Sequence, residues 1–443
     1  MTLVQETVQA HRGVSQSLDA LGVYPTARRP PAALQETFFM GALWLFYVFV
    51  LTFRPQELWL PLGVMRPAMM SKMALLGGLV ISGLRWRYRM PQLYARVAMA
   101  AAAALSVPFS YYPVLSLRLF FQEFLMAVFF LVGINSVRSL KLVRHSLWIC
   151  LASYTVSCGW ALAAQGDRAR IGGIVSDIAG SSDLGIVLTM TVGIAMGLLS
   201  RCRKHSAKLI LCGAIVVCSF GVVRTGSRGT FLGFIAMVVL WTFLSRRLFA
   251  RRALGLMAAT AVALVLLLPT GRLSRQATIL DREGQEAGQY RLDLMTGAVK
   301  MFCDYPLTGV GVGCFPRAFF DYRPKSYEKA SPWGAAWMHC HNLYFTVLAE
   351  MGLPGIVSIL ALHFYTLWAL FRIVRSGDRA GVLGERECLA QALLLALFGS
   401  CAGSLFVPGR SVPFDMLLIL SVTVCYSRPT EARKAPRRMR KRD

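Results

Sequence analysis

Two histidines, His339 and His341, stand two residues apart at the head of a long apolar segment, and Asn342 follows the second. The whole chain holds six histidines, so this pair is a candidate for chemistry. Three interpretations are open: a metal pair, a buried structural histidine, or a general base at the outer face of a membrane. A metal site usually takes three or four ligands, and no nearby Asp or Glu has convincing helical spacing, so no metal site is predicted. An imidazole of pKa about 6.5 suits proton transfer near neutral pH.

The spacing after His341 favours the general base. On a helix that advances about 100° per residue, a single face carries Phe345, Leu348, Gly352 and Gly355 below the histidine. The two glycines leave room for another helix or a lipid chain to approach closely.

Two other residues of this segment complete its interpretation. Pro354 is expected to kink or break the helix, because proline lacks a backbone donor and clashes with the preceding turn. Glu350 lies about half a turn from the face of His341. We therefore expect Glu350 to pack or to form an ion pair, rather than to act as the partner of the histidine.

Arginines stand at four places between apolar segments, where a charge is expensive and indicates a functional site. Arg170 lies in "RARIGG", and Arg228 lies in "GSRG", where glycines leave space for a ligand. The planar guanidinium suits bidentate contact with phosphate. Arg54 and Arg410 suit contact with lipid headgroups equally well. The sequence therefore predicts an anion site at Arg170 and Arg228.

Apolar helices must position these side chains. The chain of 443 residues is 56% hydrophobic, with a mean hydropathy of +0.53. A membrane-spanning helix needs about 20 apolar residues. The composition predicts an all-α, polytopic helical membrane protein with about 12 transmembrane helices. The predicted spans are 38–54, 62–84, 92–110, 117–136, 145–164, 178–199, 207–223, 229–244, 253–269, 355–372, 388–408 and 411–426.

The net charge of +26 is concentrated in the loops that alternate along this order of spans. The positive-inside rule places these loops in the cytoplasm. Residues 1–37 then form a cytoplasmic tail, 38–426 the membrane domain and 427–443 a basic cytoplasmic tail. The histidine pair and the four arginines fall on the outer face. This distribution is typical of a membrane protein, and no nucleic-acid partner is predicted. No cleavable signal peptide is predicted either.

One large outward loop, residues 270–340, is inserted before the histidine motif. Its glycine-rich "LTGVGVG" predicts a tight turn or a close backbone approach, and it lacks the Lys-Ser/Thr ending of a nucleotide-binding loop. A disulfide between Cys303 and Cys314 is possible in this loop. The preceding segment predicts an amphipathic helix whose apolar face holds Leu292, Met295, Val299 and Phe302.

The histidine segment "HNLYFTVLAEMGLPG" resembles the signature of the O-antigen ligase and polymerase superfamily. In that signature a His and a polar residue are followed, after nine residues, by a Gly and then by a second small residue. "YRLDLMTGAVKMFCDYPLTGVGVGCF" is similar to the family's loop helix and glycine turn, with Arg291 at the helix start. "TGSRGTFLGF" and "RIGGIVSDIAGSSDLG" resemble its arginine elements, although Asp183 stands where many members have Asn. The residues that fit the signature are His341, Asn342, Gly352 and Gly355.

The resemblance implies a metal-independent membrane glycosyltransferase of the bacterial inner membrane that needs no cofactor. Such an enzyme moves a glycan from undecaprenyl diphosphate to an acceptor sugar hydroxyl at the periplasmic face, with inversion. Carried over by motif, Arg170 and Arg228 hold the diphosphate, Arg291 assists them, and His341 takes the proton of the hydroxyl. The implied partners are the polyprenyl-diphosphate donor, a lipid A–core or other glycan acceptor, and membrane lipids.

Several functions are compatible with this resemblance. We expect O-antigen ligation to lipid A–core in lipopolysaccharide synthesis. A surface polysaccharide polymerase and a protein O-oligosaccharyltransferase are alternatives within the superfamily. A transporter without bond-forming activity is the alternative from another class. It would use the intramembrane acids Glu123, Asp183 and Asp415, although the sequence shows no inverted repeat.

Overall fold

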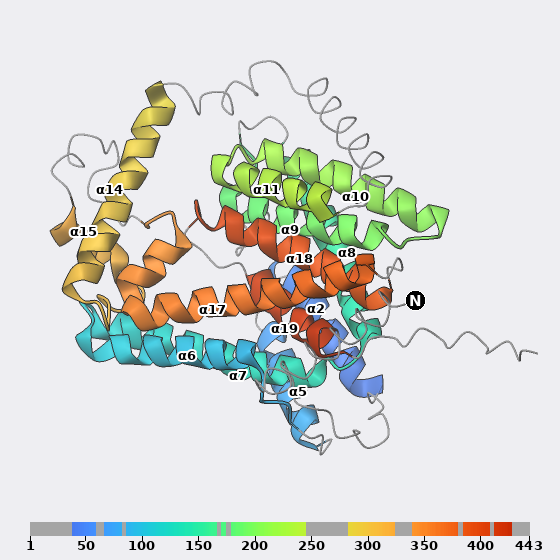
Figure 1. Cartoon of the computed structure of the whole chain (residues 1–443), viewed down its shortest axis with the longest axis horizontal. Coiled ribbons are helices and arrows are strands. Elements are labelled where there is room, and N and C mark those ends of the chain that lie inside the picture. The colour runs from blue at the N-terminus through green and yellow to red at the C-terminus, as the bar shows by residue number, and fades with distance from the viewer. Residues whose placement is uncertain are drawn as a thin grey trace, which may run out of the picture. The chain divides into compact units, whose positions relative to one another are not determined.

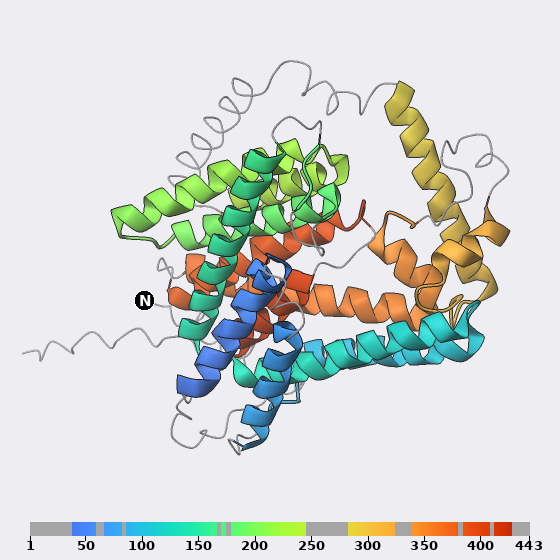
Figure 2. The same cartoon turned by 180° about the vertical axis from the view of Figure 1, so that it is seen from behind.

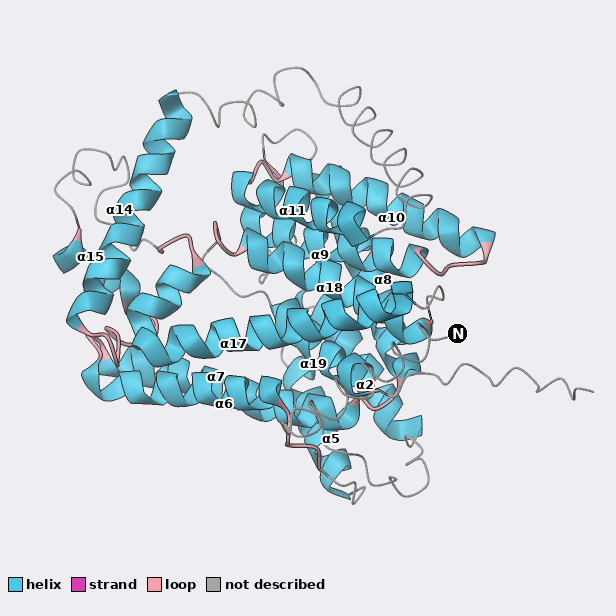
Figure 3. Cartoon of the chain, viewed as in Figure 1, coloured by secondary structure: helices cyan, strands magenta, loops and turns pink. Residues whose placement is uncertain are grey.

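The computed structural model describes residues 38–58, 66–81, 86–165, 170–173, 179–244, 282–323, 339–379, 384–407 and 412–427. The chain divides into two units, Met1–Thr37 and Phe38–Asp443, and every described residue belongs to the second. All regular structure within these ranges is helical, and none of them contains a strand (Figure 3). The predicted all-α class is confirmed.

Several of the described helices suit a lipid environment. Six are long and apolar enough to cross a membrane: Pro91–Phe109, Pro113–Ser136, Leu140–Ala164, Ser181–Leu199, His205–Arg224 and Leu343–Gly377. Four further apolar helices are shorter: Phe39–Phe53, Pro67–Ile81, Arg228–Leu244 and Pro413–Tyr426. The chain is a membrane protein, while the count of twelve crossings stays a prediction.

Each predicted span that falls on described residues coincides with a helix, and the run 253–269 lies outside them. The boundaries differ where proline begins a helix, as at Pro67, Pro91 and Pro113. Proline fits the first helical position, where its missing N–H would be unpaired in any case. The helices are α2 (Phe38–Phe53), α3 (Pro55–Leu58), α5 (Pro67–Ile81), α6 (Pro91–Ser106), α7 (Pro113–Ser136), α8 (Leu140–Ala164), α9 (Ser181–Leu199), α10 (His205–Arg224), α11 (Arg228–Leu244), α14 (Arg282–Asp304), α15 (Phe315–Tyr322), α17 (Leu343–Arg379), α18 (Glu385–Gly403) and α19 (Val412–Tyr426).

Two groups of helices carry the candidate site residues. In one group α9 packs against α10, α11 and α18, and in the other α17 packs against α6 beside α7 (Figure 1). Helices α14 and α15 lie at one end of the second group, as the reverse view also shows (Figure 2). Helix α17 also contacts α18, so the two groups are joined.

Small residues bring α9 and α18 into close contact. A Cβ on Gly193 would lie 2.7 Å from the backbone nitrogen of Ala396, and a Cβ on Gly197 would lie 2.2 Å from the Cα of Ala392. Glycines four residues apart let two helices approach backbone to backbone, which is common in membranes. This contact holds α18, whose C-terminal end carries part of the site described below.

Helix α17 is broken near its start. Gly352 has φ of 61° inside this helix, and Pro354 follows it. The predicted interruption at Pro354 is confirmed, and Figure 1 shows the change of direction at this end of α17. The helix begins at Leu343, which is twelve residues before the predicted span 355–372.

Helix α14 is amphipathic, but its predicted apolar face was wrong. Leu292 and Val299 are 57% and 41% exposed, so they do not form its core face. Of the predicted face, Met295 packs partly against this cluster. The buried stripe is shifted around the helix because it faces α15 and the glycine-rich turn, a partner that apolar spacing alone does not indicate. The buried residues of α14 are Leu294, Ala298 and Met301, which pack against Phe315 and Phe319 of α15.

The possible disulfide between Cys303 and Cys314 is not formed. Cys303 is exposed, whereas Cys314 is buried. The Sγ atom of Cys314 lies 3.4 Å from the hydroxyl oxygen of Ser116 in α7. Cys314 therefore packs against a membrane helix instead of bridging to α14.

Candidate active site

His341 lies just before α17 and not on it. Its φ is +53°, a left-handed conformation that non-glycine residues seldom adopt. The side-chain oxygen of Asn342 accepts the backbone N–H groups of Tyr344 (2.9 Å) and Phe345 (3.1 Å), which is the pattern of a helix N-cap. The prediction that His341 heads one helical face with Phe345 and Leu348 was therefore wrong, because the helix starts only after the cap.

Asn342 also ties this segment to the end of α18. Its amide nitrogen donates to the carbonyl oxygen of Leu405 over 2.9 Å, and the N–H of Leu343 donates to the carbonyl of Ser404 over 3.0 Å. Asn342 is 4% exposed. One buried side chain thus starts the helix and fixes it to a neighbour, and His341 is the residue that it holds in place.

The glycine-rich turn fills the break in α17. The N–H groups of Val310 and Gly311 donate to the carbonyls of Ala349 (2.9 Å) and Glu350 (3.1 Å), which the break leaves without helical partners. In return, the N–H of Leu353 donates to the carbonyl of Pro306 over 2.8 Å. The predicted close backbone approach is confirmed.

This approach explains the glycines of the histidine motif. A Cβ on Gly352 would lie 2.5 Å from the carbonyl oxygen of Pro306, so no larger residue fits without movement. A Cβ on Gly355 would lie 2.4 Å from the Cβ of Met351 in the same helix. The neighbours of both glycines belong to this chain's own turn and helix. The expectation that these two positions admit another helix or a lipid chain was therefore wrong.

Glu350 holds α15 to the same break. Its Oε1 accepts the N–H of Phe315 over 3.1 Å, and the residue is 7% exposed. A carboxylate at the start of a helix satisfies donors that have no helical partner. Glu350 is thus a packing residue, as the sequence predicted.

The turn is also anchored to the tip between α6 and α7. The N–H of Tyr111 donates to the carbonyl of Val310 over 3.0 Å. The hydroxyl of Ser116 donates to the carbonyl of Val312 over 2.9 Å, and the N–H of Val312 donates to the hydroxyl of Ser106 over 3.1 Å. Helices α6 and α7, together with α17, therefore fix the turn that supports the histidine segment.

Arg170 is fixed to the segment that precedes Arg228. Its Nε donates to the carbonyl of Thr225 over 3.1 Å, and its Nη2 donates to the hydroxyl of Ser181 over 2.6 Å. The hydroxyls of Ser182 and Ser227 lie 3.0 Å apart. These bonds join the start of α9 to the turn between α10 and α11, so the two arginine elements predicted from sequence form one cluster.

Arg228 is the first residue of α11, and its neighbour contacts the end of α18. A Cβ on Gly229 would lie 2.2 Å from the Cβ of Phe406, so α11 and residues 404–406 touch closely. Leu405, next to Phe406, is the residue to which Asn342 donates. The arginine segment and the histidine segment are therefore attached to the same three residues.

Arg291 completes a cluster of positive charge. Burial, and then the charge of Arg228, lower the pKa of Arg291 below its ordinary value. Burial, then the charges of Arg291 and His339, lower the pKa of His341. Repulsion of this kind acts only between groups that are near one another. Arg291 therefore lies near both Arg228 and His341, and Arg170 is linked through Thr225 to the segment that precedes Arg228.

This arrangement suits an anion next to a neutral base. Two guanidinium groups favour a ligand with negative charge. Burial, and then the charges of Arg291 and His339, lower the pKa of His341 and so favour its neutral form. Arg54 pairs with Glu57 in α3, and Arg410 lies outside the described residues. No group of three or more His, Cys, Asp or Glu that could hold a metal ion was found among the described residues.

Sequence reasoning missed the part played by residues 404–406. Their contacts use backbone carbonyls and one phenyl ring, so their residue types carry no signal. Ser181, which binds Arg170, was also missed, although a hydroxyl at the start of a helix near an arginine is a recognisable pattern.

A comparison with known protein families covers part of this site. Residues 213–360 match a family model described as O-antigen ligase. The match supports the resemblance to the O-antigen ligase and polymerase superfamily. This part of the chain, about a third of it, includes Arg228, Arg291 and His341, while Arg170 precedes it. No curated protein matches the chain. The family supports glycan transfer of the O-antigen ligase or polymerase type by a membrane enzyme.

Proposed function

We propose that this O-antigen ligase family protein transfers a glycan from undecaprenyl diphosphate to an acceptor sugar hydroxyl at the periplasmic face of the bacterial inner membrane. The acceptor is lipid A–core. One observation carries the proposal: in the matched domain Arg291 lies within electrostatic reach of both His341 and Arg228, and the histidine and Arg228 segments contact the same residues 404–406.

The reaction follows from the charges. The acceptor oxygen bonds to the anomeric carbon of the donor glycan from the side opposite the diphosphate, which inverts the configuration. The carbon–oxygen bond to the diphosphate breaks, and its electron pair stays on the phosphate oxygen. Arg228 and Arg291, with Arg170 beside them, stabilise the charge that develops there, where fixed cations are most effective.

His341 removes the proton of the acceptor hydroxyl. It can do so because burial and neighbouring cations hold it in the neutral form. General-base catalysis of this kind contributes about 10²–10⁴-fold to a rate. Asn342, Gly352 and Gly355 support the reaction indirectly, since they shape the cap and the break that hold His341. The chemistry proposed here requires no metal and no cofactor.

The topology is part of the proposal. Both termini lie in the cytoplasm, and residues 1–37 and 427–443 form the tails of a membrane domain at 38–426. The loop 270–340 faces the periplasm, and its described parts include α14 and the glycine-rich turn. The partners are the lipid-linked donor, the glycan acceptor and the surrounding membrane lipids, without nucleic acid.

A polysaccharide polymerase is the second candidate, because the matched family supports it equally. A transporter is less well supported. Glu123 of α7 forms an ion pair of 2.8 Å with Arg96 of α6, so it has a structural partner. Asp183 lies in the first turn of α9, where a carboxylate stabilises the helix.

The test is a reconstituted transfer reaction with purified protein in detergent. The wild type is incubated with undecaprenyl-diphosphate glycan and lipid A–core, with EDTA and without ATP, and the acceptor is followed by its gel shift. A shifted acceptor supports the ligase. Lengthening of the donor glycan alone would replace it with the polymerase, and no product from well-folded protein would contradict glycan transfer altogether.

A further inference from the structure

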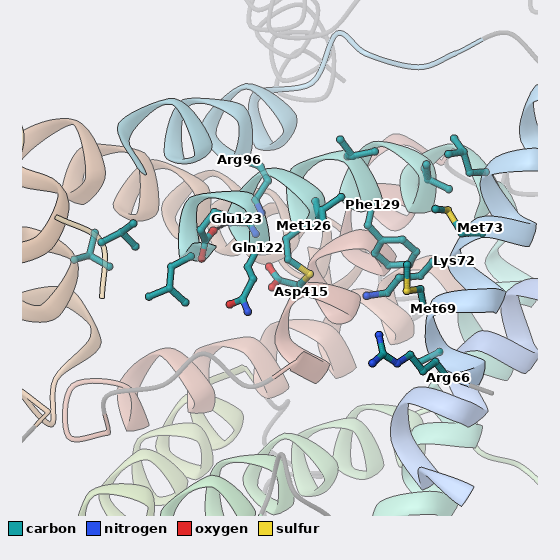
Figure 4. Close-up of a pocket in the computed structure, with 18 of the residues that line it drawn as sticks. Arg66, Met69, Lys72, Met73, Arg96, Gln122, Glu123, Met126, Phe129 and Asp415 are labelled. Atoms are coloured by element: carbon teal, nitrogen blue, oxygen red, sulfur yellow. Dashed lines mark hydrogen bonds and ion pairs between the residues drawn. The ribbon is translucent and has the colours of Figure 1, made fainter. Parts of the chain in front are cut away.

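A cavity of about 1110 Å³ lies between α5, α7, the start of α17 and α19, and the reaction described above leaves it without a role (Figure 4). Typical small-molecule pockets measure about 300–1,000 Å³, so this cavity is large enough for part of a lipid. Most of its wall is apolar and comes from side chains such as Leu76, Leu119, Met126, Phe129 and Val347.

The cavity is accessible from the side of the protein that faces lipid. Met69 and Met73 of α5 line it and are 54% and 59% exposed. Leu125 of α7 lines it as well and is 62% exposed. Because α5 and α7 are apolar helices of a membrane protein, these exposed side chains contact acyl chains. A lipid can therefore reach the cavity from the bilayer.

The cavity also contains a buried carboxylate that needs a partner. Asp415, in the first turn of α19, is 8% exposed, and its Oδ1 has no hydrogen-bond partner among the described residues. A buried carboxylate oxygen without a donor is costly, even where cations such as Lys72 and Arg96 interact with the carboxylate electrostatically. Figure 4 shows Asp415 at the cavity wall, on the side toward Lys72. A ligand hydroxyl could supply the missing donor.

Cationic groups stand in the same cavity. Lys72 and Arg66 both line the cavity (Figure 4). The Nζ atom of Lys72 lies 5.0 Å from the ring centroid of Phe129. Arg96 is 1% exposed and binds Glu123 through Nη1, while its Nε and Nη2 have no partner among the described residues. These donors suit a ligand that carries negative charge as well as hydroxyl groups.

The cavity adjoins the candidate active site. Leu343 and Thr346 of α17 line it, and Leu343 is two residues from His341. Arg228 lies beyond residues 404–406, to which the histidine segment is attached through Leu343 and Asn342. The segment that follows the histidine thus lines the cavity and is also bonded to the residues that contact α11, so an acceptor in the cavity lies on the same segment as the proposed base.

We infer that this cavity binds the lipid-borne acceptor, a glycolipid whose apolar chains enter between α5 and α7 and whose phosphorylated, hydroxylated head contacts Asp415, Lys72, Arg66 and Arg96. This inference rests on the proposed function and specifies its acceptor site. Charge complementarity selects this occupant. A simple phospholipid offers the phosphate, whereas a phosphorylated sugar also offers hydroxyl groups that can donate to the carboxylate of Asp415.

Lipid binding tests the inference directly. The purified full chain is titrated in detergent with lipid A and, separately, with phosphatidic acid, whose headgroup is a phosphate without the hydroxyl groups of a sugar. We expect lipid A to bind more tightly, and we expect Lys72→Met and Asp415→Asn each to weaken it by about tenfold, the effect of one hydrogen bond to a charged group. Lys141→Met, an exposed lysine in α8, is the matched control and should bind as the wild type does. Thermal unfolding of each variant reports its folding.

Two results would overturn the inference. One is unchanged lipid A binding in folded Lys72→Met and Asp415→Asn, and the other is binding of phosphatidic acid as tight as that of lipid A.

The transfer assay separates this inference from the proposed function. If the inference is correct, both variants raise KM for the acceptor about tenfold and leave KM for the donor unchanged. Transfer that depends on His341, with an unchanged acceptor KM in both variants, would contradict acceptor binding in the cavity and leave the proposed reaction standing. Lipid A binding that depends on Lys72 and Asp415, without any transfer by the wild type, would support the lipid site in the cavity and contradict the proposed reaction.

Discussion

His341 combines two properties that favour a catalytic role. Its backbone holds a left-handed conformation, which costs energy and is found often at functional sites. Burial, and then positive neighbours, lower the pKa of its side chain, so the neutral form that can accept a proton is favoured near neutral pH. A histidine that served only packing would need neither the adjacent arginine nor the cap and carbonyl contacts made by Asn342.

The pH dependence of transfer should reflect this environment. The base must be unprotonated, and the pKa of His341 lies below its ordinary value of about 6.5. We therefore expect kcat/KM for the donor to stay constant as pH falls to about 6.5 and to decline only below it. An inflection well above 6.5 would contradict the assigned environment.

Asn342 can be tested by separating its two contacts. Serine is about as good a helix cap as asparagine, but it cannot reach Leu405. We expect Asn342→Ser to lower the free energy of unfolding by about 1 kcal/mol through the lost contact with Leu405, and to lower kcat roughly fivefold because His341 is then held less firmly. Asn342→Ala should lower the free energy of unfolding by about a further 1 kcal/mol, because it also removes the cap. Wild-type kcat in Asn342→Ser would show that the contact with Leu405 does not position the histidine.

At the scale of elements, the break in α17 and the glycine-rich turn form one unit. Hydropathy predicted the helix, and Pro354 predicted its interruption. The use of the free carbonyls by Val310 and Gly311 was not predictable, because the turn lies about forty residues upstream and its contacts are made by the backbone. The face of α14 was mispredicted for a related reason, since its packing partner was unknown.

Gly352→Ala should damage this unit. The new Cβ would meet the carbonyl of Pro306 in a left-handed conformation, for which we expect a loss of about 1–3 kcal/mol in the free energy of unfolding and a lower melting temperature. Gly213→Ala in α10 is the matched control, because a Cβ there has nothing within 4 Å. Equal melting temperatures of the two variants would mean that the broken segment of α17 can shift to accept a Cβ at position 352 without loss of stability.

At the scale of the whole molecule, close packing of α9 on α18 positions the site. Residues 404–406 receive the histidine segment from one side and α11 from the other. The sequence predicted the arginines of the site, because a charged residue between apolar spans is costly and indicates a function. It could not predict the three residues that bring arginine and histidine segments together, since the contact depends on how far α18 extends between them.

The charge cluster predicts a link between Arg291 and His341. Replacing Arg291 by Gln removes a positive neighbour, so the pKa of His341 should rise toward its ordinary value. The inflection of kcat/KM against pH should then move to higher pH. Lys300→Gln, an exposed position on the same helix, is the control and should leave the profile unchanged. A profile that Arg291→Gln does not shift would separate the arginine from the histidine.

The most direct measurement is a single turnover of His341→Gln with bound undecaprenyl-diphosphate glycan and lipid A–core. Glutamine keeps a polar side chain of similar length but cannot take the proton. The account predicts transfer slowed by about 10²–10⁴-fold, with donor binding close to that of the wild type. Transfer at the wild-type rate by this folded variant would contradict the role of His341 as the general base.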